Sequence, residues 1–330
     1  MNIKDPQIYI DGVRAQDRRV LSKTITLIES SLPAHRELAR AVLDALLPYS
    51  GKAVRLGITG VPGVGKSTFI ESLGGALVKK GYRLAVLAVD PSSSRSGGSV
   101  MADKTRMEKL ALEKNAFIRP SPSGGTLGGV ARKTRETMLV CEAAGFDVII
   151  VETVGVGQSE SAVASMVDFF LVLMLAGAGD ELQGIKRGVL ELADALAINK
   201  ADGDNAEKAE KAAKIYASAL NILQPPTPSW APPVLTCSAL EMSGIDKIWQ
   251  TVVDHREKMS HSGELNQKRR EQALDWMWNL VREGLQERFY QHPEVKKCLP
   301  LIARSVEKGE TTPTIAATKL LLFLDNKPEI

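Results

Sequence analysis

One octapeptide constrains this chain of 330 residues more than any other segment, and it reads Gly60-Val61-Pro62-Gly63-Val64-Gly65-Lys66-Ser67. The spacing Gly-x-x-x-x-Gly-Lys-Ser, here followed by Thr68, is typical of a loop that binds phosphate through its backbone amides. Glycine is needed because the backbone must bend tightly and approach the ligand without a Cβ in the way. Lys66 would place its charge near the β- and γ-phosphates, and the Ser67 hydroxyl would ligate Mg²⁺. The octapeptide therefore predicts a nucleotide site at the start of a helix.

The flanking residues support this interpretation over a glycine-rich surface turn. Residues 53–58 are apolar enough to form a short buried strand that runs into the loop. Residues 68–80 are expected to form a helix that Gly81 ends, with one apolar face made by Phe69, Ile70, Leu73, Leu77 and Val78.

A second motif, Asn199-Lys200-Ala201-Asp202, follows the apolar run 194–198 and indicates which base is bound. A carboxylate at Asp202 can accept hydrogen bonds from guanine N1–H and N2–H₂, donors that adenine does not offer as a pair. A site built around such bonds rejects the other base strongly, because its own polar groups would be left unpaired. Asn199 would contact the N7/O6 edge or brace the loop, and the Lys200 stem would cover the base. The alternative is that Asp202 caps the following helix.

Ser238-Ala239-Leu240 ends another apolar run and matches the second base-contacting loop of many GTPases. The three residues are weak evidence alone, but they fit a guanine site that already has Asn199–Asp202. The expected ligands are GTP and GDP.

The magnesium site needs oxygen ligands and nearby carboxylates. The apolar run 145–151 ends in Glu152, which would order a Mg²⁺-bound water, and the amide of Gly155 would sense the γ-phosphate. Most GTPases have Asp-x-x-Gly here, so Glu-Thr-Val-Gly favours an indirect contact to the metal. Asp90 follows the apolar run 84–89 and is a second candidate, with a turn cap as its alternative. Asp103 is a candidate metal ligand or a solvated carboxylate. The predicted catalytic residues are Lys66, Asp90 and Glu152.

The motifs together resemble the MeaB/ArgK family of P-loop GTPases of the SIMIBI class. The resemblance covers nearly the whole chain and rests on residues 60–68, 89–94, 119–122, 152–160 and 199–202. It implies an accessory protein that uses GTP binding and hydrolysis to gate cofactor loading and protection of a B12-dependent methylmalonyl-CoA mutase. It also implies a homodimer, helical extensions around the GTPase domain, and a switch loop at residues 176–186 that signals to the mutase.

Composition gives a globular protein with a net charge of +3 and 25% charged residues. We therefore expect no nucleic-acid partner and no membrane partner, because the charges are mixed and no apolar run is long enough to span a bilayer. The first residues lack the apolar core of a signal peptide, so a cytoplasmic location is expected. The three cysteines stand far apart, which argues against disulfides. The four histidines are scattered and expected at the surface, and no histidine cluster accompanies the cysteines, which argues against a transition-metal site.

The chain is predicted to be an α/β protein with a doubly wound, mostly parallel sheet of the P-loop type. Residues 1–50 would form a helical extension, 51–255 the GTPase domain, and 256–330 a helical region for dimerisation. Residues 123–129 are glycine-rich and read better as a switch loop than as a second phosphate contact. A wide apolar stripe in the last region fits either a dimer contact or packing on the GTPase domain, and it contains Leu274, Met277, Trp278, Val281 and Leu285.

Two other functions compete with a GTPase switch. A kinase would pass the γ-phosphate to a protein or small molecule, but no acceptor site is evident in the sequence. A GTPase that targets proteins to membranes or assembles ribosomes would need a basic or methionine-rich module, and none is evident either. No residue stands out as an arginine finger, which predicts slow hydrolysis that a partner or a dimer rearrangement accelerates.

Overall fold

The computed structural model describes residues 5–30, 32–89, 107–120, 127–153, 159–177, 187–220 and 227–325. The chain divides into two compact units, Met1–Lys268 and Arg269–Ile330. The boundary falls inside one long helix, α12 (Glu264–Gln291).

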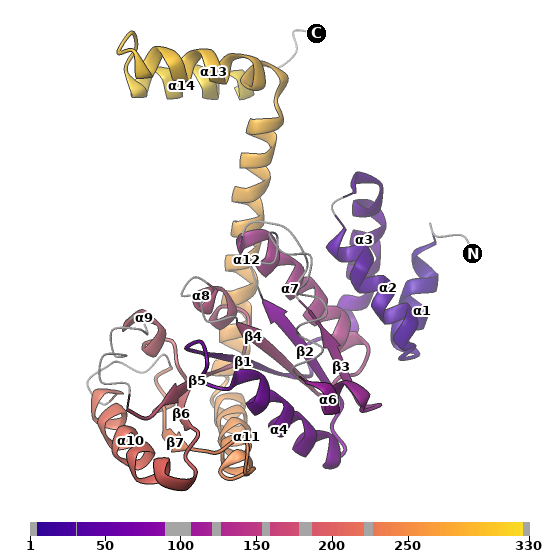
Figure 1. The fold of residues 1–330 in the computed structure, drawn as a ribbon. Coiled ribbons are helices and arrows are strands. Elements are labelled where there is room, and N and C mark those ends of the chain that lie inside the picture. Colours follow the sequence, from indigo (N-terminus) through magenta and orange to yellow (C-terminus); the bar gives the residue numbers. More distant parts are fainter. Residues whose placement is uncertain are drawn as a thin grey trace. The chain divides into compact units, whose positions relative to one another are not determined.

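The first unit is built on a parallel sheet of seven strands within the described residues (Figure 1). The strands are β1 (Val54–Gly60), β2 (Leu84–Val89), β3 (Ala116–Arg119), β4 (Val148–Thr153), β5 (Phe169–Leu175), β6 (Ala195–Asn199) and β7 (Val234–Thr236). Their order across the sheet is β3-β2-β4-β1-β5-β6-β7. The chain leaves β1 toward one side of the sheet and later returns to its other side. In such a sheet, ligands bind at the carboxyl ends of the strands next to this reversal. The predicted doubly wound α/β fold is confirmed.

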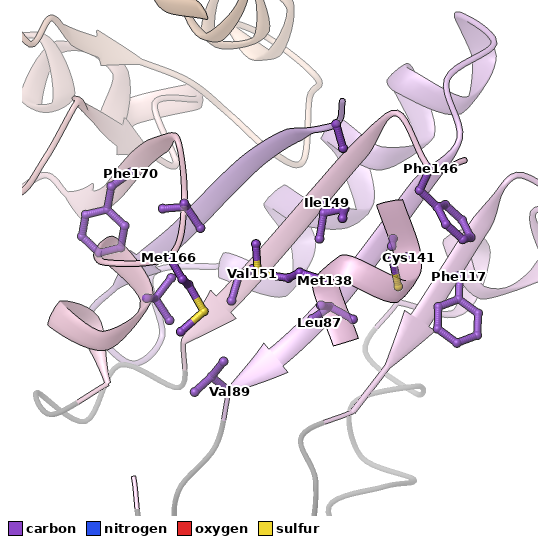
Figure 2. Close-up of a cluster of buried hydrophobic side chains, with 14 of the residues drawn as sticks. Leu87, Val89, Phe117, Met138, Cys141, Phe146, Ile149, Val151, Met166 and Phe170 are labelled. Atoms are coloured by element: carbon purple, nitrogen blue, oxygen red, sulfur yellow. The ribbon is translucent and has the colours of Figure 1, made fainter. Parts of the chain in front are cut away.

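Both faces of the sheet are buried, which explains the nearly continuous apolar runs of its strands. Alternate residues of β4 point to opposite sides: Ile149 and Val151 join one cluster of buried side chains, and Val148 and Ile150 join the other. Figure 2 shows the first cluster, in which Ile149 and Val151 lie with Leu87 and Val89 of the neighbouring strand β2.

Helices cover each face. On the side of the first cluster lies α7 (Leu127–Ala143), with Met138 and Cys141 in the core. On the other side α4 (Lys66–Lys79) packs beside α11 (Ile245–Ser262). Among the described residues, this part of the unit also contains the helices α6 (Glu108–Leu112), α8 (Glu160–Ala164), α9 (Arg187–Leu190) and α10 (Ala206–Leu220), with the 3₁₀ turns η1 (Leu47–Tyr49) and η2 (Gly203–Asn205).

The N-terminal helices α1 (Pro6–Arg14), α2 (Arg18–Glu29) and α3 (Pro33–Leu46) belong to the same compact unit as the sheet. Asp5 and Asp17 cap the first two helices through their side chains. The apolar face of α2 is buried and α2 packs against α7. An ion pair between Arg119 and Glu29 joins α2 to the end of β3.

One histidine contradicts the expectation of a surface position. His255 of α11 is 1% exposed and packs edge-on against the rings of Phe169 and Trp230. Its Nε2 lies 3.7 Å from Oδ1 of the buried Asp194. The burial of His255 was not predictable from the sequence, because the aromatic residues that surround it come from segments far away along the chain.

The second unit contains most of α12 together with α13 (Pro293–Glu307) and α14 (Pro313–Asp325), and the last two pack on each other. The apolar stripe of α12 is exposed on the single chain: Leu274 is 56% and Trp278 55% exposed. Among the described helices, none is both long enough and apolar enough to cross a membrane.

Candidate nucleotide-binding site

The phosphate loop lies where β1 ends and α4 begins, at the centre of the sheet. β1 extends to Gly60, two residues farther than predicted, because Thr59 and Gly60 still pair with β5. At two glycines of the phosphate loop, both the space available and the backbone conformation exclude a side chain. A Cβ on Gly60 would lie 2.5 Å from the Leu173 carbonyl oxygen, and one on Gly65 would lie 2.9 Å from Asn199 Nδ2. Gly65 has a φ of 93°, a left-handed conformation, and α4 starts directly after it at Lys66.

The side chain of Lys66 is held at the loop that it belongs to. Its Nζ donates to the carbonyl oxygen of Gly60 at 2.8 Å and to that of Val61 at 3.3 Å, and the residue is only 9% exposed. A buried ammonium group needs such acceptors, because its charge is otherwise costly to remove from water. The positive charge is thereby fixed beside the backbone amides of the loop.

The two predicted magnesium residues that the structure describes lie together. Ser67 Oγ donates to Glu152 Oε1 at 3.3 Å. The contact follows from the sheet, since β4 pairs with β1 so that Glu152 lies opposite Ile58. One hydroxyl and one carboxylate oxygen at this distance are ligands of the hard type that Mg²⁺ prefers.

Behind this pair lies a contact that sequence reasoning missed. Thr59 of β1 and Thr153 of β4 are both buried, and their hydroxyl oxygens lie 2.7 Å apart. The bond joins the residue before the phosphate loop to the residue after Glu152. The available signal was a threonine near the end of each of two apolar strands.

Asn199 connects three loops of the site. It ends β6 and is 1% exposed; its Nδ2 donates to the Val64 carbonyl at 2.8 Å, and its Oδ1 accepts from the Ala239 amide at 3.1 Å. The Cys237 thiol lies 3.6 Å from the same Oδ1. Burial raises the pKa of Cys237 to about 12, so the thiol stays neutral and serves as a weak donor. These contacts are those of a brace between the phosphate loop and the second base loop.

The rest of the second motif extends this connection. Lys200 has a φ of 60° and its Nζ donates to the Gly63 carbonyl at 2.9 Å. A non-glycine residue in this conformation is strained, and such strain gathers at functional sites. Asp202 precedes η2, but its side chain makes no capping bond; it accepts instead from the Ser238 hydroxyl. The cap alternative for Asp202 is therefore not what the structure shows.

The second base loop is fixed at two further points. Ser238 Oγ accepts from the Glu241 amide at 3.1 Å, and the Ala239 carbonyl accepts from Ser72 Oγ of α4 at 2.6 Å. Leu240 is 81% exposed beside these anchored residues. Ser72 is a further residue that the sequence did not indicate.

Several predicted residues lie outside the described part of the chain: Asp90, Asp103, Gly155, and most of the segments 123–129 and 176–186. The strand before Asp90, β2, ends at Val89, which pairs with Thr153. The roles assigned to these residues stay predictions.

Comparison with known proteins decides the family. The profile of the family described as methylmalonyl-CoA mutase-associated GTPase MeaB matches residues 21–294. The chain belongs to the MeaB family. A probable GTPase of Mycobacterium tuberculosis (strain H37Rv) is 55% identical over 316 residues, with 94% of each chain covered. The GTPase ArgK of Escherichia coli is 46% identical, with 96% of each chain covered.

A mouse relative is described as the mitochondrial methylmalonic aciduria type A homolog. It is 47% identical over 325 residues, which cover 96% of this chain and 78% of the relative. Among solved structures, that of a LAO/AO transport system kinase covers 99% of each chain with a TM-score of 0.79 and 40% identity.

Membership of the MeaB family settles the class of activity. The protein is a P-loop GTPase and an accessory protein of methylmalonyl-CoA mutase. Although the protein of the matching solved structure is named as a kinase, the family is described as a GTPase family, and the Escherichia coli relative is named a GTPase. Hydrolysis of GTP, rather than transfer of phosphate to a second substrate, is therefore the activity of this chain.

Proposed function

We propose that this MeaB protein binds GTP with Mg²⁺ in the site described above and, as a homodimer, gates cofactor loading and protection of a B12-dependent methylmalonyl-CoA mutase. The observation that carries the nucleotide part is the Asn199 brace, which holds the phosphate loop and the second base loop in one rigid arrangement. Family membership supports the mutase as partner.

The proposed chemistry is transfer of the γ-phosphoryl group to water. Loop amides and the Lys66 ammonium would stabilise the charge that spreads over the phosphate oxygens. Ser67 and Glu152 would hold Mg²⁺, which would neutralise charge on the β- and γ-phosphates when bound. Asp90 would position the attacking water, and Asp103 is a further candidate near the metal.

Base selection would rest on Asp202. The Ser238 hydroxyl donates a hydrogen bond to its carboxylate, which orients the group. An ionised carboxylate accepts only, so it matches the two donors of guanine.

The dimer is proposed from the exposed stripe of α12. This amount of exposed apolar surface on one helix is unusual, and a partner surface would bury it. The stripe consists of Leu274, Met277, Trp278, Val281 and Leu285. Light scattering after gel filtration would test this. We expect the mass of a dimer, and a monomer after Trp278→Asp; a wild-type monomer would refute the dimer.

The cytoplasmic location also stays a prediction.

The partner is tested by pulldown from native cytosol with the protein loaded with GDP or a non-hydrolysable GTP analogue. We expect a B12-dependent mutase to be recovered, in amounts that depend on the nucleotide. Lys66→Ala, which removes the loop cation, is expected to lose that dependence. Absence of the mutase from both samples would contradict the proposal.

A further inference from the structure

A second recess lies at the amino ends of the strands, opposite to the nucleotide site. Its volume is about 990 Å³, and its lining includes Val54 at the start of β1, Tyr82 just before β2 and Asp147 just before β4. These three residues lie at the amino ends of their strands, whereas the phosphate and base loops lie at the carboxyl ends. All residues of the lining belong to the first compact unit. We call this recess the amino-edge cleft.

Aromatic side chains form the floor of the amino-edge cleft. Phe146 and Trp249 are 7% and 5% exposed. The rings of Tyr82 and Trp249 meet edge to face with their centres 5.5 Å apart. Packing of this kind fixes the rings in place, so the floor is a preformed apolar surface.

Cations from three separate segments form part of the rim: Arg14 of α1, Lys52 before β1, and Arg256 of α11. The Arg14 guanidinium lies 4.1 Å from the centre of the Tyr49 ring. Arg256 Nη2 donates to the Lys52 carbonyl at 2.6 Å. Among the described residues, neither Arg14 nor Lys52 pairs with a carboxylate.

The carboxylates of the cleft balance these charges only in part. Glu142 is fully engaged: its oxygens accept from Arg55 at 2.8 and 2.9 Å and from the Gly51 amide at 2.6 Å. Asp147 Oδ2 accepts from the Arg83 amide at 2.8 Å. Glu257 is exposed on the rim. The rim therefore offers cationic groups beside an apolar, aromatic floor.

We propose that the amino-edge cleft binds a small organic anion with a flat aromatic body. The aromatic part would lie on Trp249, and a phosphate or carboxylate group would be bound by Arg14 and Lys52. The volume of the amino-edge cleft is in the range of binding sites for small organic ligands. Such sites are mostly apolar and have a few polar groups that orient the ligand. The cleft contains neither the glycine-rich loop nor the Asn199–Asp202 motif, so it is a second site rather than part of the nucleotide site.

The test uses three probes on the full-length protein saturated with GDP and Mg²⁺, so that the phosphate loop is occupied. The probes are 1-naphthyl phosphate, 1-naphthol, which lacks the anion, and inorganic phosphate, which lacks the ring. Calorimetry is expected to show that 1-naphthyl phosphate binds roughly tenfold or more tightly than either of the others. Equal affinities, or no binding of 1-naphthyl phosphate, would overturn the proposal.

Variants place the binding in the cleft. Arg14→Gln and Lys52→Gln change exposed residues, so both proteins are expected to fold, and each should weaken binding of 1-naphthyl phosphate by about tenfold. Arg19→Gln removes the same charge from an exposed position on α2 outside the cleft and should leave the affinity unchanged. Unchanged binding in both cleft variants, or an equal loss in the control, would show that the anion binds elsewhere and would refute the site.

Discussion

Replacement of Asn199 by alanine tests the brace at the centre of the site. The substitution removes the amide that donates to Val64 and accepts from Ala239. Both partners belong to loops that contact nucleotide in the proposed complex. The variant thus removes contacts among the three loops without changing Lys66 or Asp202, the residues proposed to bind phosphate and guanine.

The magnitude follows from burial. Asn199 is 1% exposed, so water cannot replace its hydrogen bonds easily, and each abandoned partner costs roughly 1–3 kcal/mol. Two such partners give a total of about 2–6 kcal/mol. Because the bonds join distant segments of the folded chain, part of this cost should lower the stability of the protein. The remainder should weaken nucleotide binding, because the ligand must then order loops that the wild-type protein holds in place.

The assay is a pair of measurements on each protein: thermal unfolding without nucleotide, and calorimetric titration with GDP in the presence of Mg²⁺. We expect Asn199→Ala to unfold at a lower temperature and to bind GDP about 30-fold more weakly, the equivalent of about 2 kcal/mol. Asn205→Ala is the matched control. Asn205 is partly exposed, and its side chain donates one solvent-accessible bond, to the Lys200 carbonyl at 2.6 Å, so its loss should cost about 1 kcal/mol or less.

The reasoning would be refuted if Asn199→Ala were no more harmful than Asn205→Ala in both measurements. A loss of stability with unchanged GDP affinity would restrict Asn199 to a structural role. It would then remove the brace as the observation that supports the nucleotide site.

Three other predictions follow from single contacts. Asp202→Asn should shift preference from GTP toward xanthosine triphosphate, since the amide donor matches the xanthine oxygen; unchanged selectivity in a competition assay would contradict the base assignment. Thr59→Val should destabilise the protein by roughly 1–3 kcal/mol, because it leaves the buried Thr153 hydroxyl without its partner. Thr59→Val with Thr153→Val should recover much of that loss in urea unfolding, and no recovery would refute the pairing. Burial lowers the pKa of His255 below its ordinary 6.5, so the unfolded chain takes up a proton that the folded chain does not. Stability should therefore fall as the pH drops below about 6.5, down to the folded pKa, and His255→Phe should flatten this slope between about pH 8 and about pH 5.5 in thermal unfolding; the same slope in both proteins would exclude His255 as its source.

The fold class was predictable because its signals are local. An apolar run, a glycine-rich turn and an amphipathic helix occur in direct succession around Lys66, and the sheet is buried on both faces, so its strands are apolar throughout. Helix and strand ends were less predictable. β1 extends through Thr59 and Gly60 because its neighbour β5 continues to pair with it, and that pairing is not visible from the residues of β1.

The candidate site shows the same division. The motifs identified the loops, because glycine, lysine, asparagine and aspartate stand at fixed spacings within each one. The contacts between loops were not predictable. Asn199 reaches Val64 across 135 positions, and Ser72 reaches Ala239 across 167. His255 was misplaced for the same reason, since the rings that bury it come from β5 and from the loop before β7.

Isothermal titration calorimetry of the purified protein with Mg²⁺ and four nucleotides tests the central claim most directly. The site described here predicts binding of GTP and GDP, and no comparable heat from ATP or ADP, because Asp202 is proposed to pair with donors that only guanine presents. Absence of heat with the guanine nucleotides, or tighter binding of the adenine nucleotides, would contradict the account.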